Sequence, residues 1–241
     1  MKNFLKIFDL NNELPLSISK HQKLYEIMLM IYSCIIMPAL SAIVATRGED
    51  RAIYKSLSYL AYTEGHMALI YLWGLCFFVG YFFALTLILY LGGYTKKWKM
   101  VFYSLAAIST VVLVTGLSVP WLHVEGELAP KYDRLRVIHN NLATLGFVLV
   151  VVTTILLFLS TLFRNLRQGM ISLGVAGYLF ITSFVAIKEA NIVPGPCPVS
   201  AIAQIYIFST ILFVMFLQYV FMKAMPINVT NAISEQSKNL I

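Results

Sequence analysis

Residues 67–92, MALIYLWGLCFFVGYFFALTLILYLG, decide the fold class of this chain because they include no Asp, Glu, Lys or Arg. A helix needs about 20 predominantly apolar residues to cross the hydrocarbon core of a bilayer, which is roughly 30 Å thick. Further charge-free stretches bring the total to a little over half of the chain: 27–46, 100–122, 142–163, 169–187 and 201–222. The sequence therefore predicts an all-α, polytopic integral membrane bundle of six transmembrane helices.

The composition of the whole chain supports this class. Of its 241 residues, 59% are hydrophobic and 12% are charged, against about 45–50% and about 25% in a typical soluble domain. All charged residues and all four histidines lie outside the six charge-free stretches. We expect a cytoplasmic N-terminal arm (1–26), a six-helix domain (27–222) and a cytoplasmic tail (223–241). The pattern excludes a soluble enzyme, a secreted disulfide module and a disordered chain.

The net charge of +7 indicates topology once the charges are sorted by segment. The two ends of the chain and the segments 93–99 and 164–168 together hold eleven cations and four acids, whereas the alternate segments hold seven of each. Cytoplasmic segments carry the excess of Lys and Arg, so both termini are predicted to be cytoplasmic. We expect membrane lipids and other membrane-protein subunits as partners, no nucleic acid, and a location in the plasma membrane or an endomembrane.

The polar residues that could bind a ligand or take part in a reaction lie at the outer ends of the predicted spans. Glu64, His66, His139, Asn140 and Glu189 all lie there and form a candidate ligand-binding rim. The charge-free spans argue against pumping, because coupled pathways use ionisable residues inside the bilayer. The favoured function is recognition of a lipid headgroup or a partner protein through this rim. A second alternative is an oligomeric pore or a subunit of a larger membrane complex.

The same rim allows a metal or haem site. The pattern His123-x-Glu125-x-Glu127 would place three ligands on one face of an extended segment, and His66 and His139 could complete the shell. His66 and His139, which precede different spans, could alternatively hold haem b between two helices. Either group would make the protein a membrane oxidoreductase or hydrolase. Neither cofactor is preferred on the sequence alone.

Two local patterns predict contacts at the outer surface. Ile53, Leu57, Leu60 and Ala61 fall on one helical face, which predicts a short helix in the membrane interface before the second span. Gln204 lies near the outer end of the sixth span and is expected to form an interhelical hydrogen bond.

Small residues in the fifth span make a further prediction. Gly169, Gly174 and Gly177 would allow close backbone approach of a neighbouring span or of a partner helix. The outer segment 123–141 is interpreted as a polar loop that precedes the fourth span.

The layout resembles the superfamily of DRAM and Sfk proteins, over about residues 25–223. Two segments carry the resemblance: 56–66, from Ser56-Leu57-Ser58 to Glu64-Gly65-His66, and 138–143, Ile138-His139-Asn140-Asn141-Leu142-Ala143. The superfamily includes damage-regulated autophagy modulators, the GPI-remodelling PGAP proteins and bacterial members. The resemblance implies that His139 is the family's loop-to-helix histidine and that the protein is a regulator or a lipid-linked accessory protein. The charged insert 123–136 has no counterpart in that layout.

Overall fold

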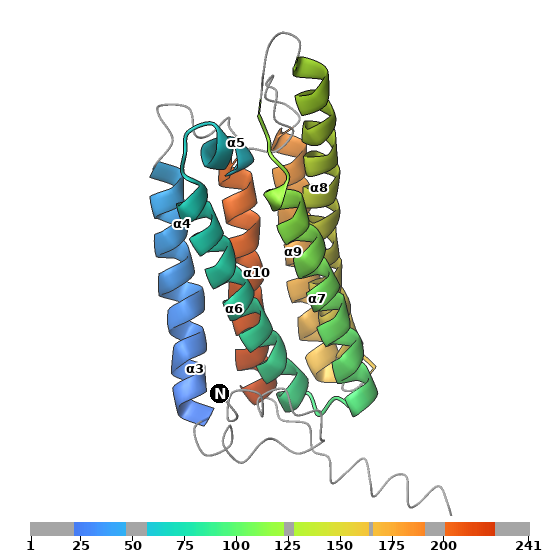
Figure 1. The fold of residues 1–241 in the computed structure, drawn as a ribbon. Coiled ribbons are helices and arrows are strands. Elements are labelled where there is room, and N and C mark those ends of the chain that lie inside the picture. Colours follow the sequence, from blue (N-terminus) through green and yellow to red (C-terminus); the bar gives the residue numbers. More distant parts are fainter. Residues whose placement is uncertain (1–21, 47–56, 123–127, 164–165, 191–200, 225–241) are drawn as a thin grey trace, which may run out of the picture.

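The computed structural model describes residues 22–46, 57–122, 128–163, 166–190 and 201–224. In this part of the chain every regular element is a helix, and the long helices run side by side as a bundle (Figure 1). Those long and apolar enough to cross a membrane are Lys23–Thr46, Met67–Leu91, Lys96–Ser118, Pro130–Ser160 and Gln204–Ala224. The predicted class, an all-α multi-pass integral membrane protein, is confirmed by these five helices.

The elements follow one another along the chain in a simple order. They are α3 (Gln22–Ile31), η2 (Tyr32–Ile36), α4 (Met37–Thr46), α5 (Leu57–Tyr62), α6 (Met67–Leu91), α7 (Lys96–Ser118), α8 (Ala129–Ser160), α9 (Leu166–Ala190) and α10 (Ala201–Ala224). The helix α9 contains a shorter apolar segment, Gln168–Phe184.

A π-helical turn, η2, joins α3 to α4 within the first span. It lies directly before Pro38, which has no N–H to donate and whose ring crowds the carbonyl four residues earlier. The N–H of Met37 bonds to the carbonyl of Tyr32, one residue further back than in an α-helix. The wider turn therefore accommodates the proline and keeps the first span continuous.

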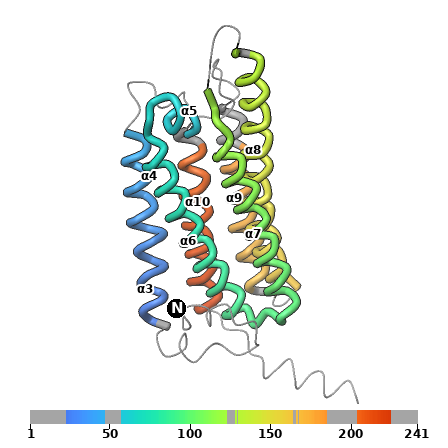
Figure 2. Tube along the Cα trace, in the orientation of Figure 1, coloured from blue at the N-terminus to red at the C-terminus, as the bar shows by residue number. Residues whose placement is uncertain are grey.

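Helices α6 and α10 form the centre of the bundle, and α10 lies between the first span and α9 (Figure 2). In α6 and in α10, 61% of the apolar 18-residue stretch is buried, against 28% in the first span and in α7. Helix α10 contacts α4, α6, α8 and α9. A polar cluster ties it to two of its neighbours, because Ser41 Oγ lies 3.0 Å from Ser209 Oγ and accepts a hydrogen bond from Trp73 Nε1. The core is therefore apolar with a few paired polar groups.

Glycines bring α7 and α8 together, but they are not the glycines that the sequence singled out. A Cβ at Gly116 would lie 2.6 Å from the backbone nitrogen of Ala143, and one at Gly146 would lie 2.6 Å from Cα of Leu113. These contacts leave room for no side chain, so only glycine permits this spacing of the helices.

The prediction for the fifth span holds only at Gly169, where a Cβ would lie 2.3 Å from Cα of Leu162. At Gly174 and Gly177 no atom lies within 4 Å of the added Cβ. The close approach within this chain is therefore wrong for those two positions, since the face that carries them points away from the neighbouring helices.

Helix α8 begins earlier than the sequence pattern predicts. It starts at Ala129, so that much of the segment 123–141 is helix and not loop. Pro130 lies in its first turn, a position where the fixed φ of proline favours helix formation, and Asp133 bonds Arg136 at 3.1 Å. The 32 residues of α8 span about 48 Å at 1.5 Å per residue, more than a bilayer core requires. Its charged first turns extend beyond the other helices (Figure 1).

A sharp turn folds the short helix α5 onto the end of the bundle. Gly65 has φ of +76°, a conformation that residues with a Cβ avoid, and His66 N–H donates to the carbonyl of Leu60 across the turn. Leu57, Leu60 and Ala61 are buried as the predicted helical face requires, whereas Ile53 lies outside the described residues. The turn thereby places Ser58 against the end of the bundle.

The two ends of the bundle have different contents. At the end where α3 begins and α10 ends, Lys223 Nζ lies 2.6 Å from Glu26 Oε2. We name this the α3 end. At the other end, the α5 end, lie α5, the start of α6, the last turn of α7, the first half of α8 and the start of α10 (Figure 1).

Candidate functional site

A cavity of about 150 Å³ lies inside the bundle at the α5 end. Residues of α5, α6, α7, α8 and α10 line it, and it opens partly to the surface, where Thr144 and Val148 of α8 are exposed. A dry cavity of this size holds an apolar group about as large as benzene. The cavity is therefore large enough for part of a lipid chain.

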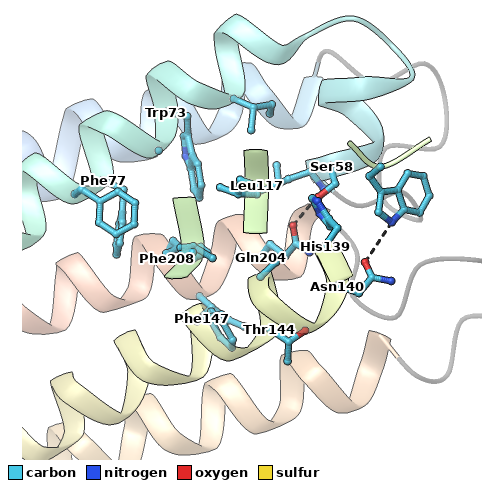
Figure 3. Close-up of a pocket in the computed structure, with 18 of the residues that line it drawn as sticks. Ser58, Trp73, Phe77, Leu117, His139, Asn140, Thr144, Phe147, Gln204 and Phe208 are labelled. Atoms are coloured by element: carbon cyan, nitrogen blue, oxygen red, sulfur yellow. Dashed lines mark hydrogen bonds between the residues drawn. The ribbon is translucent and has the colours of Figure 1, made fainter. Parts of the chain in front are cut away.

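Aromatic side chains form the deep wall of the cavity, as the close-up shows (Figure 3). The ring of Phe208 lies 4.7 Å from that of Phe77 and 5.4 Å from that of Trp73, both edge to face. Phe147 of α8 meets the same ring at 5.6 Å. Edge-to-face packing of this kind fixes the rings relative to one another, so the deep wall is apolar and well ordered.

Polar side chains gather at the opposite end of the cavity (Figure 3). Ser58 Oγ lies 2.6 Å from Nε2 of His139, and Nδ1 of the same imidazole lies 2.8 Å from the carbonyl oxygen of Val119. A carbonyl can only accept, so Nδ1 carries the proton and Nε2 accepts from the Ser58 hydroxyl. Both side chains are buried and both line the cavity.

Two carboxamides complete the polar end. Asn140 Oδ1 accepts a hydrogen bond of 3.2 Å from the indole N–H of Trp121, and Gln204 Oε1 accepts one of the same length from the backbone N–H of Leu57. The interhelical hydrogen bond expected of Gln204 is therefore confirmed, with α5 as its partner. Each contact turns an amide oxygen to the protein and sets the orientation of its NH2 group.

A tyrosine supports the imidazole from the side. The ring of Tyr62 lies 6.3 Å from that of His139, edge to face, and its hydroxyl donates to the carbonyl of Leu117 at 2.6 Å. Burial, followed by the neighbouring Tyr71, raises the pKa of Tyr62 to about 12. The phenol therefore remains a donor at neutral pH and holds α5 against the last turn of α7.

The structure brings only part of the predicted rim together. His139 and Asn140 line the cavity, whereas Glu64 and His66 lie in the turn between α5 and α6 and are not among its lining residues. Glu189 lies near the end of α9, but its side chain is outside the described part of the structure. The site is therefore an internal cavity beneath the rim.

Of the residues predicted to hold a metal ion or haem, some lie in the described part of the structure and others outside it. His123, Glu125 and Glu127 lie outside the described residues. The described residues contain no group of three or more His, Cys, Asp or Glu side chains placed to hold a metal ion. Both ring nitrogens of His139 already have partners in the protein, so a metal or haem iron bound there would have to displace one of them.

Three residues that define the site were not among the predicted site residues: Ser58, Trp73 and Phe208. Ser58 lies 81 residues from His139 along the chain, and no local spacing links the two. Ser58 lies in the segment 56–66 that carries the family resemblance and among the apolar positions of the helix predicted before the second span, but neither pattern points to His139 as its partner. Trp73 and Phe208 lie within charge-free spans, where aromatic residues are common.

The fold and the cavity define an all-α, multi-pass membrane protein with a polar-ended apolar cavity at one end of its bundle. Comparisons of this chain with protein-family models, with curated proteins and with solved structures find no match.

Proposed function

We propose that this protein binds a membrane lipid in the cavity, with its apolar chain against the aromatic wall and its polar group at Ser58, His139, Asn140 and Gln204. The observation that carries the proposal is the division of the cavity into an aromatic end and a polar end. Binding sites for small amphipathic molecules combine an apolar lining with a few placed polar groups. This proposal narrows the predicted lipid recognition from the surface rim to the cavity.

The proposed topology has six crossings, with α9 as the fifth, and both termini in the cytoplasm. The contact between Lys223 and Glu26 supports an even number of crossings, because α10 ends where α3 begins. The excess of Lys and Arg in the segments at that end supports its cytoplasmic side. The α5 end then faces outward, as the rim hypothesis requires. Membership of the DRAM and Sfk superfamily remains part of this proposal.

The exposed positions Thr144 and Val148 suggest how a lipid enters. They lie on α8 within its apolar stretch, on the wall of the cavity. A lipid can therefore insert its chain sideways from the membrane, with no passage through water. The polar end of the cavity would then receive the headgroup close to the membrane surface.

Two glycines provide a matched test. Gly74 lines the cavity, Gly174 does not, and no atom lies within 4 Å of a Cβ added at either position. We expect Gly74→Leu to fill the cavity and Gly174→Leu to leave it open. Native mass spectrometry of the purified full chain would count retained lipid. We expect about a tenfold loss of occupancy, or about 1.4 kcal/mol, in Gly74→Leu alone. Equal occupancy in both variants would overturn the proposal.

A further inference from the structure

We propose that Ser58 and His139 form a nucleophile–base pair that cleaves a carboxylic ester of the lipid bound in the cavity. This inference rests on the proposed function, because the cavity has to deliver the ester to Ser58.

The three groups stand in the order that activates a serine. The hydroxyl of Ser58 donates to Nε2 of His139 at 2.6 Å, and the carbonyl of Val119 accepts from Nδ1–H at 2.8 Å. A nucleophile within hydrogen-bond reach of a base, and a third group that orients the base, is the arrangement shared by serine hydrolases on unrelated folds. In this protein the backbone carbonyl of Val119 orients the imidazole of His139.

The hydrogen bond of Ser58 differs from those of several other hydroxyls in the bundle, which bond within their own helix. Ser109, for example, donates to the carbonyl of Leu105, one turn back in its own helix. The same local pattern holds for Thr110, Thr154, Ser172 and Thr182. Ser58 instead reaches an imidazole on another helix, at a position that lines a cavity. A contact that only joined α5 to α8 would not need to face a binding space.

The surroundings suit charge development during ester cleavage. His139 is 1% exposed and Ser58 is 6% exposed, so bulk water screens the pair poorly. Asn140 and Gln204 line the same end of the cavity, and their oxygens accept from Trp121 and from the backbone of Leu57. Both carboxamides therefore lie at the end of the cavity that holds the pair.

The chemistry is acyl transfer without redox change. Ser58 Oγ attacks the ester carbonyl carbon while its proton passes to Nε2 of His139. The bond from that carbon to the alcohol oxygen then breaks, and His139 gives the proton to the departing alcohol. A water molecule next attacks the acyl–serine, gives its proton to Nε2, and releases the carboxylic acid as Oγ recovers its proton. The co-reactant is water.

A fluorophosphonate probe tests the pair, because it phosphonylates only an activated serine. The full chain in lipid nanodiscs would be treated with the probe and the modified residue located by peptide mass spectrometry. We expect one label, on Ser58. It should be absent in Ser58→Ala, slowed about 100-fold or more in His139→Gln because the general base is lost, and unchanged in Ser109→Ala. Release of p-nitrophenol from p-nitrophenyl octanoate should follow the same order.

The lipid count separates this inference from the proposed function. Thermal unfolding in detergent shows whether Ser58→Ala and His139→Gln are folded, and both should retain more lipid than Gly74→Leu, because they leave the apolar part of the cavity open. If Ser58 is not labelled while Gly74→Leu still loses lipid, the ester cleavage is wrong and lipid binding stands. If labelling persists in His139→Gln, or falls on another serine, the pair is wrong. If Ser58 is labelled while Gly74→Leu keeps its lipid, the cavity proposal is the one that fails.

Discussion

The two ends of the bundle use polar side chains differently. At the α3 end the polar side chains form hydrogen bonds in pairs. Tyr94 Oη lies 2.6 Å from Ser160 Oγ, and Gln218 Nε2 donates to Ser172 Oγ, also at 2.6 Å. At the α5 end the polar groups are also hydrogen-bonded, but they face a cavity.

The polar groups at the two ends therefore have different structural roles. Buried hydrogen bonds between helices fix the helices relative to one another, which requires no empty space. A cavity lowers stability, because its lining loses contacts. The cavity at the α5 end carries such a loss of contacts, which is why the functional proposals concern that end.

The largest effect is expected from truncating one buried aromatic residue at each end. Tyr94→Ala and Phe208→Ala should each lower the free energy of unfolding by about 3–5 kcal/mol. Added benzene should recover part of the loss in Phe208→Ala, because that space joins an apolar cavity, and little in Tyr94→Ala, where Ser160 makes the space polar. Thermal unfolding in detergent with and without benzene measures both. Equal recovery in the two variants would remove the distinction between the ends.

The two glutamines of α10 give the next effect. Gln218 is 1% exposed, and Gln218→Ala should destabilise the protein by about 1–3 kcal/mol, because Ser172 Oγ loses its donor and keeps only its own bond to the carbonyl of Gln168. Gln204→Ala should cost less stability but reduce lipid retention, since Gln204 lines the cavity. Chemical unfolding and the lipid count are the two measurements. A loss of lipid in Gln218→Ala would show that the α3 end takes part in binding.

One glycine in a turn at each end of the bundle allows the same backbone substitution to be compared at the two ends. Gly65 at the α5 end and Gly93 at the α3 end have φ of +76° and +57°, and nothing lies within 4 Å of a Cβ added at either. Each substitution by Ala should cost about 1–2 kcal/mol, for the left-handed conformation alone. Only Gly65→Ala should slow the labelling of Ser58, because it shifts α5. The same labelling rate in both variants would contradict that role.

The smallest effect is expected at the ion pair. Lys223 is half exposed, so Glu26→Gln should change stability by about 0–1 kcal/mol, with no effect on lipid or labelling. The wild type should approach the variant as salt rises to about 1 M, where charges are screened within about 3 Å. A salt-independent difference above that range would mean that Glu26 has a larger role at the α3 end.

The sequence predicts those parts of the fold that depend on hydrophobicity alone. The charge-free stretch 67–92 matches α6, and the short helix predicted before it is present as α5, with Leu57, Leu60 and Ala61 buried. The start of α8 was not predictable in this way. Lys131, Asp133 and their neighbours mark the segment as polar, but a helix that extends past the membrane can carry charges.

The site was predictable only where one residue carried the signal. His139 was selected because it lies at the predicted outer end of a span and because the family resemblance implies a histidine there, but its partners depend on how distant segments meet. Ser58 reaches it through the turn at Gly65, and Val119 through the packing of α7 on α8 at Gly116. Glycine contacts of this kind depend on helix rotation, which also explains why no neighbouring span of this chain approaches Gly174 and Gly177; approach by a partner helix there stays a prediction.

The central place of α10 has a consequence for biosynthesis. Ribosomes deliver the chain from the N-terminus, so this central helix enters the membrane after all the other described helices. Until it does, the backbone N–H of Leu57 lacks the acceptor that Gln204 supplies, and Ser172 lacks the donor that Gln218 supplies. A nascent chain stopped before residue 201 would expose these groups to lipid, which favours holding the early helices at the insertion machinery until α10 arrives.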